Sequence, residues 1–167
     1  SAMKSRKVRS TIEKILECVA QEVYKESKEP NDVLLYYILL GKIQLLSAMY
    51  RSKHKLKISQ FLSNTTKLNL TSIEKSNNNR QATKNAAALM KQGKAAMAAG
   101  FFLIATPPRV RDAINVLCSR CNSQDGDRHL SVVIAYLCDY NERVGSSSNF
   151  SGNSNHMEYT RKRWFPI

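Results

Sequence analysis

Cysteine and histidine are the residues of this chain with the strongest metal and redox chemistry. Cys118 and Cys121 form a Cys-x-x-Cys pair, and His129 and Cys138 follow it. Three thiolates and one imidazole would complete a tetrahedral zinc site. Cys118 and Cys138 nevertheless fall in apolar helical patterns, where a cysteine acts as a small hydrophobic residue. We therefore expect no metal and no cofactor.

The sequence offers no recognisable catalytic constellation. The cysteine pair falls at the C-terminal end of a helical pattern, which does not stabilise a thiolate for redox chemistry. His54, His129 and His156 appear without a matched nucleophile or acid. Gly93 and Gly100 lie inside a helical pattern and form no phosphate-binding loop. We expect a protein that is not an enzyme and has no small-molecule substrate.

The chain is strongly basic, with 26 Lys and Arg against 13 Asp and Glu and a formal net charge of +13. This balance favours an acidic or polyanionic partner. One basic cluster follows a long apolar segment and supplies the candidate phosphate contacts, Arg51, Lys53, Lys55 and Lys57. Cations in a last helical turn also stabilise the helix end, so the cluster has a structural explanation as well. A nucleic-acid-binding helical domain is the alternative function that this charge supports.

The end of the chain differs in composition from everything before it. Residues 145–155 contain only Gly, Ser, Asn and one Phe, which is typical of a flexible tether of about 15 to 20 Å. His156-Met157 resembles a cloning junction, so we assign residues 145–157 to a linker.

Residues 158–167, with the sequence EYTRKRWFPI, then combine aromatic anchors with cations. Trp, Tyr and Arg dominate interface energetics. We interpret this segment as a short linear motif, native or fused from a partner protein; the alternatives are that it packs back on its own domain or is a disordered end. Its proposed anchors are Tyr159, Arg161, Lys162, Arg163, Trp164, Phe165 and Pro166.

The elements that must position these groups are helices. Apolar residues from Val8 to Val23 recur at helical spacing, and Pro30 ends that helix. The same helix carries the densest acidic surface, a candidate rim for a basic ligand, formed by Glu13, Glu17, Glu22 and Glu26. Residues 32–50 are apolar on nearly every side and predict a central helix rather than a membrane span, because Gly41 and Lys42 interrupt them.

The remaining segments are also helical. Residues 57–76 predict two short helices, and residues 80–105 predict a long one. In that long helix Ala86, Gly93 and Gly100 are seven residues apart, which predicts a face that closely approaches the apolar second helix. Thr106 and two prolines predict the start of another helix, and residues 130–137 show the clearest helical period.

Together these patterns predict an all-α fold, a compact bundle of five to six helices over residues 4–144. Residues 1–3 resemble the scar of a cleaved expression tag and are left out of the fold. The four cysteines form no disulfide framework, which favours an intracellular location.

The function that these features favour is an adaptor domain that binds a short aromatic and basic motif in a groove between helices. Its partner would be another protein, with no membrane involved. The adaptor class is common in transcription and chromatin regulation, which makes a nuclear location the expectation. Sequons at Asn64, Asn69 and Asn149 leave a secreted helical-bundle ligand as a second alternative.

Overall fold

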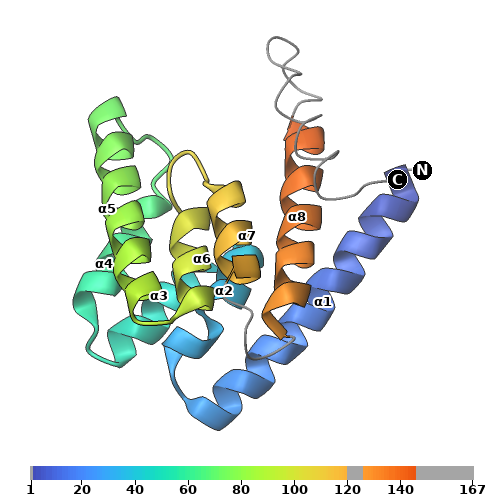
Figure 1. The fold of residues 1–167 in the computed structure, drawn as a ribbon, viewed down its shortest axis with the longest axis horizontal. Coiled ribbons are helices and arrows are strands. Elements are labelled where there is room, and N and C mark those ends of the chain that lie inside the picture. The colour runs from blue at the N-terminus through green and yellow to red at the C-terminus, as the bar shows by residue number, and fades with distance from the viewer. Residues whose placement is uncertain (1, 120–125, 146–167) are drawn as a thin grey trace. The chain divides into compact units, whose positions relative to one another are not determined.

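The protein is described by a computed structural model that covers residues 2–119 and 126–145, with side-chain surroundings for residues 3–119 and 129–138. Every regular element in these ranges is an α-helix, and none of the described residues forms a strand (Figure 1). The helices are α1 (Ala2–Ser27), α2 (Pro30–Leu39), α3 (Ile43–Ser52), α4 (Leu56–Thr65), α5 (Ser72–Lys91), α6 (Ala95–Leu103), α7 (Val110–Ser119) and α8 (Gly126–Gly145). The all-α class is confirmed, and the predicted count of five to six helices was too low.

The count was too low because two predicted long helices are each divided by a glycine. Gly41 separates α2 from α3 with φ of 69°, and Gly93 separates α5 from α6 with φ of 75°. A left-handed residue cannot continue a right-handed helix, and glycine adopts this conformation without strain. Residues 32–50 and 80–105 therefore each fold into parts of two helices.

One turn geometry recurs at three helix junctions. The residue after each left-handed position is a lysine, and its amide donates to a carbonyl five residues earlier: Lys42 to Tyr37 at 2.8 Å, Lys55 to Tyr50 at 3.0 Å and Lys94 to Leu89 at 2.9 Å. This is the Schellman pattern, which satisfies carbonyl groups at a helix end. At the middle junction the left-handed residue is His54, with φ of 57°. The turn therefore forms there without glycine.

The centre of the fold is the packing of α2 against α6. Both helices are strongly apolar, and α2 buries Val33, Leu34 and Leu35. At Gly100 of α6, a Cβ atom would lie 2.2 Å from Cδ2 of Leu34. The predicted close approach of the glycine face to the second helix is therefore confirmed at Gly100. It was wrong at Gly93, which ends α5 instead of lying within it.

Polar contacts also join neighbouring helices around this centre. The hydroxyl of buried Ser47 in α3 donates to the carbonyl of Ser59 in α4 at 2.8 Å. Arg109 precedes α7 and donates from its guanidinium to Thr83 of α5 at 3.0 Å, while that guanidinium lies 5.4 Å from the ring centre of Phe102 in α6. Figure 1 shows α5, α6 and α7 side by side, as these contacts require.

The starts of two helices differ by a few residues from the prediction. α7 begins at Val110 rather than at the two prolines, because the amide of Arg109 still donates to the carbonyl of Phe102 at 2.9 Å. α5 begins earlier than expected, at Ser72, where Thr71 and Glu74 form a reciprocal capping box. The residues between Thr71 and Arg80 therefore belong to α5 and not to a separate short helix.

The chain divides into two compact units, Ser1–Leu137 and Cys138–Ile167. In the first unit, the predicted helical period of residues 130–137 is confirmed, with Ile134 and Leu137 buried in α8. The hydroxyl of Tyr136 in that helix donates to the carbonyl of Ser5 in α1 at 3.4 Å. In the second unit, α8 ends at Gly145. The remainder of the predicted linker and the terminal motif lie outside the described residues.

Candidate functional site

Helix α1 has two apolar faces, of which only one packs on the domain. Leu16 and Ala20 are buried. Val8, Ile15 and Val19 remain 48%, 57% and 38% exposed. These three are seven and four residues apart, which places them in one stripe along a helix of 3.6 residues per turn. The apolar pattern that predicted α1 therefore contains a second face with no described neighbour covering it.

Two exposed glutamates extend the same stripe. Glu22 is seven residues from Ile15 and Glu26 is seven residues from Val19, so both lie on the outward face. Glu22 is 3.9 Å from Lys25, and both side chains are largely exposed. Glu26 makes no ion pair with the described part of the chain. We define Val8, Ile15, Val19, Glu22 and Glu26 as the α1 stripe.

The other two predicted rim residues point elsewhere. Glu13 accepts from Arg9 one turn earlier at 2.8 Å. Glu17 forms an ion pair with Lys42, the residue that precedes α3. These carboxylates stabilise α1 and its position on the domain, so the predicted acidic rim divides into two structural and two outward-facing residues.

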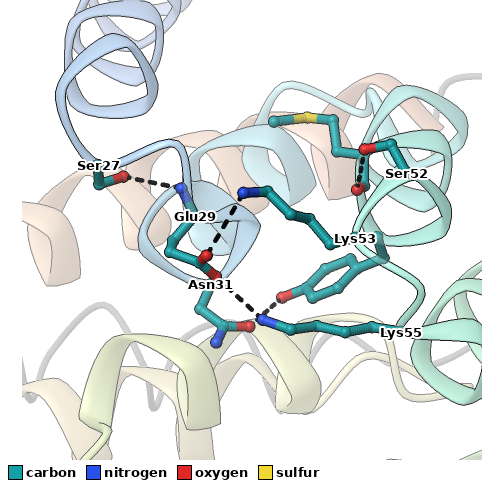
Figure 2. Close-up of polar contacts among 8 residues, drawn as sticks. Ser27, Glu29, Asn31, Ser52, Lys53 and Lys55 are labelled. Carbon is teal, nitrogen blue, oxygen red and sulfur yellow. Dashed lines mark hydrogen bonds and ion pairs between the residues drawn. The ribbon is translucent and has the colours of Figure 1, made fainter.

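The predicted basic cluster is also divided. Figure 2 shows Lys53 and Lys55 directed at Glu29, at 3.6 and 3.0 Å. The hydrogen bond from Lys55 lowers the pKa of Glu29, which keeps that carboxylate ionised. Arg51 and Lys57 are exposed and make no ion pair with any described residue. Half of the cluster therefore joins the α3–α4 turn to the start of α2.

Beside this ion-pair group, a buried tyrosine completes the contact between the two turns. The Tyr50 hydroxyl donates to Oδ1 of Asn31 at 2.9 Å (Figure 2). Burial raises the pKa of Tyr50, and the nearby carboxylates of Asp32 and Glu29 add to this effect. The amide of Glu29 donates to the Ser27 hydroxyl at 3.2 Å, which fixes the short connection from α1 to α2.

The cysteine constellation considered for zinc is not assembled in the described residues. Cys118 and Cys138 are partly exposed and His129 is exposed, whereas Cys121 lies outside the described residues. Among the side chains that the structure describes, no three of His, Cys, Asp and Glu gather as a metal site would require. In the same ranges no helix has the length and hydropathy to cross a membrane.

The predicted ligand residues in the terminal motif all lie outside the described residues: Tyr159, Arg161, Lys162, Arg163, Trp164, Phe165 and Pro166. Sequence reasoning missed the exposed half of α1, because it assigned all the apolar positions to one face. The sequence signal that could have revealed it was the width of the apolar pattern around the helix. Val8, Ile15 and Val19 lie roughly 100° around the helix from Leu16 and Ala20, wider than a single packed stripe.

Comparison with known proteins identifies the kind of domain. The family model Rav1p_C, described as RAVE protein 1 C terminal, matches residues 6–142. DmX-like protein 1 of Mus musculus is 25% identical over 152 residues, which cover 91% of this chain and 4% of that relative. The chain thus spans a small part of the relative's length, and no solved structure matches it. Because the family match runs from α1 into α8, the chain belongs to the Rav1p_C family and is a helical, adaptor-type protein-interaction domain.

Proposed function

We propose that this domain binds a short aromatic and basic segment of a protein along the α1 stripe. The observation that carries the proposal is the position of three exposed aliphatic side chains and two outward-facing glutamates on one helix face. Aliphatic groups would contact aromatic anchors, and carboxylates would attract the adjacent cations. The function is binding through contact and requires no catalysis.

The apolar part of the stripe would contribute a measurable but small free energy of binding. Fully burying a Val or Ile side chain contributes about 1.5–3 kcal/mol. Val8, Ile15 and Val19 are about half exposed, so covering them would contribute about 1 kcal/mol each on the same scale. A gain of this size, reduced by the cost of ordering the ligand, suits a short segment that a tether holds at high effective concentration.

The segment 158–167 has the composition that this stripe would recognise. Trp164 and Phe165 supply aromatic surface, and Arg161 supplies one of three cations beside them. Glu22 and Glu26 lie in the last turns of α1, beyond Val19, the last aliphatic residue of the stripe. Aromatic anchors on the aliphatic part and cations on the glutamates would therefore give the ligand a defined direction.

The chain has a built-in reporter for this contact, because Trp164 is the only tryptophan. In the full chain, Ile15→Ser should shift Trp164 emission to longer wavelength and lower its anisotropy, since the ring would lose apolar contact. Glu26→Lys should produce the same change through repulsion of the cations. Lys14→Ser is the matched control: Lys14 is exposed on α1 and lies off the stripe.

Two outcomes would contradict this proposal. Trp164 emission that is identical in the wild type, Ile15→Ser and Glu26→Lys would remove the stripe as its binding surface. Emission that responds to dilute double-stranded DNA and to salt, but not to the stripe variants, would favour the nucleic-acid alternative. A role in transcription or chromatin regulation, with a nuclear location, stays a prediction from the sequence.

A further inference from the structure

A small pocket lies between α4, the connection that follows it and the first turns of α5. Its volume is about 180 Å³. Apolar surface comes from Phe61 and Leu70, and four carboxamide side chains, Asn64, Asn77, Asn78 and Gln81, form much of the remaining wall. Lys67 and Glu74 complete the lining with one charge of each sign. The ring of Phe61 is held in place from inside the domain by stacking on Phe101, with ring centres 5.8 Å apart.

One acceptor in this pocket has no donor. Asn78 is only 9% exposed, and its Oδ1 makes no hydrogen bond with any described group. Buried polar groups in proteins are almost always hydrogen-bonded, as Ser47 is in this domain through three contacts. A buried acceptor without a partner destabilises the fold. Among the described residues, the Asn78 acceptor is therefore an unsatisfied group in the wall of the pocket.

The carboxamides continue along α5 in a regular row. Asn77, Gln81 and Asn85 are four residues apart, so they repeat about every 6 Å along the helix. An extended polypeptide presents equivalent amide groups about every 6.6 Å, which is nearly the same repeat. A carboxamide offers both donors and an acceptor, and a peptide group offers one of each. The row is thus suited to hold an extended main chain.

The local sequence of α5 is unusual without such a role. Asn77, Asn78 and Asn79 are consecutive in a helix, although asparagine is a poor helix former. The helix is held at its start by the capping box, in which the Glu74 amide donates to Oγ1 of Thr71 at 3.2 Å. The capped first turn keeps the asparagines helical, and of the three Asn77 and Asn78 line the pocket.

We propose that this pocket binds an extended segment of another polypeptide, whose main chain pairs with the carboxamides and whose single apolar side chain contacts Phe61. The volume of about 180 Å³ fits one side chain and lies below the roughly 300–1000 Å³ of small-molecule sites. Leu68 and Ile73 are exposed and adjoin the lining residues Lys67 and Glu74 in the sequence, so they offer apolar surface for the neighbouring residues of the segment. This site is separate from the α1 stripe and does not depend on it.

The test uses a defined probe, N-acetyl-leucine N-methylamide, which carries two peptide groups and one apolar side chain. It is titrated into the full chain while the side-chain amide signals are followed by NMR. The expected result is a saturable shift of the Asn78 and Gln81 signals. The analogue methylated at both nitrogens lacks the N–H donors and should bind at least tenfold more weakly.

Two variants separate binding from folding. Asn78→Leu should bind the probe at least tenfold more weakly while its thermal midpoint rises, because the buried acceptor without a donor is removed. Gln81→Ala, at an exposed position, should weaken binding with little change in the midpoint. Gln21→Ala on α1 is the control for loss of an exposed carboxamide and should leave the titration unchanged.

The following results would overturn the proposal. One is the absence of any saturable shift in the wild type at millimolar probe. Another is equal binding of the methylated analogue, which would make the pocket a purely apolar one. If Asn78→Leu fails to fold, the Gln81→Ala variant decides instead: binding of the probe as tight as in the wild type would overturn the proposal. An Ile15→Ser variant that binds the probe normally would support the independence of this site from the α1 stripe.

Discussion

The contact between α2 and α6 gives a sharp test of the packing, through Gly100→Ala. A Cβ atom at this position would lie 2.2 Å from Cδ2 and 3.7 Å from Cγ of Leu34, and 3.1 Å from Cδ1 of Ile38. Carbon atoms pack best at about 3.5–4.0 Å. Leu34 is fully buried, so its side chain cannot swing into solvent. The added methyl group therefore requires the two helices to separate or Leu34 to leave its rotamer.

The magnitude follows from two opposing effects. Alanine in place of a helical glycine contributes about 1 kcal/mol to helix stability. Overpacking a filled core costs about 1–3 kcal/mol. The added Cβ would lie only 2.2 Å from Cδ2 of buried Leu34, which places the cost of Gly100→Ala near the upper end of this range. The net loss in the free energy of unfolding should be about 2 kcal/mol. For a domain of this size that lowers the thermal midpoint by about 4–8 °C.

A double-mutant cycle measures the contact directly. Leu34→Ala alone should cost about 2–5 kcal/mol, because it leaves a cavity in the core. In the Gly100→Ala background the same substitution should cost about 2 kcal/mol less, since the new methyl group fills part of the space. Urea denaturation followed by circular dichroism gives the four free energies of unfolding.

Gly93→Ala is the matched control. No atom lies within 4 Å of a Cβ there, but the φ of 75° penalises any side chain. Gly93→Ala should therefore cost about 1 kcal/mol and show no coupling to Leu34→Ala. Stabilisation by Gly100→Ala of about 1 kcal/mol, as helix propensity alone predicts, would refute the close packing of α2 on α6.

Three further predictions concern turns and ionisable groups. His54→Gly should raise the free energy of unfolding by about 0.5–1 kcal/mol, because exposed His54 holds a φ of 57°; an unchanged urea midpoint would contradict the left-handed turn. Burial raises the pKa of Tyr50, so the neutral hydroxyl stabilises the fold below pH of about 10, and this stabilisation is lost as the pH rises toward the folded-state pKa. Tyr50→Phe should therefore lose less stability at alkaline pH than the wild type in a denaturation series. An identical alkaline profile would argue against a buried hydroxyl. The pKa of Glu29 is lowered by Lys55, so the carboxylate stabilises the fold above its unfolded pKa of about 4.3 and that contribution is lost as the pH falls through the lower folded-state value. Glu29→Gln should weaken the acid dependence slightly, because the group is exposed, and a steeper acid loss would contradict the ion pair with Lys55.

The division of the long apolar segments shows the limit of sequence reasoning for this fold. Residues 32–50 and 80–105 have helical composition throughout, so periodicity predicts their helical state correctly. Gly41, Gly93 and Gly100 look alike in sequence, yet two of them end helices and one lies within a helix. The difference depends on whether the space beside the glycine holds another helix or a reversal of the chain, which is not a local property.

The candidate sites show the same limit. The acidic positions of α1 could be found by counting charges, but Glu17 differs from Glu26 because Lys42, from the following turn, reaches only one of them. By composition alone, the run of asparagines in α5 indicates only a weak helix former. It becomes a candidate site only because α4 places Phe61 in the same pocket as Asn78, whose acceptor has no donor among the described residues.

By itself the sequence determined the helical class, the central position of the α2 segment and the period of α8, because these depend on side chains a few residues apart along one helix. Only the tertiary structure decided which glycine packs and which turns, which carboxylates are free, and that a pocket exists between α4 and α5. Those features depend on groups that are distant in the sequence and come together only when the helices pack.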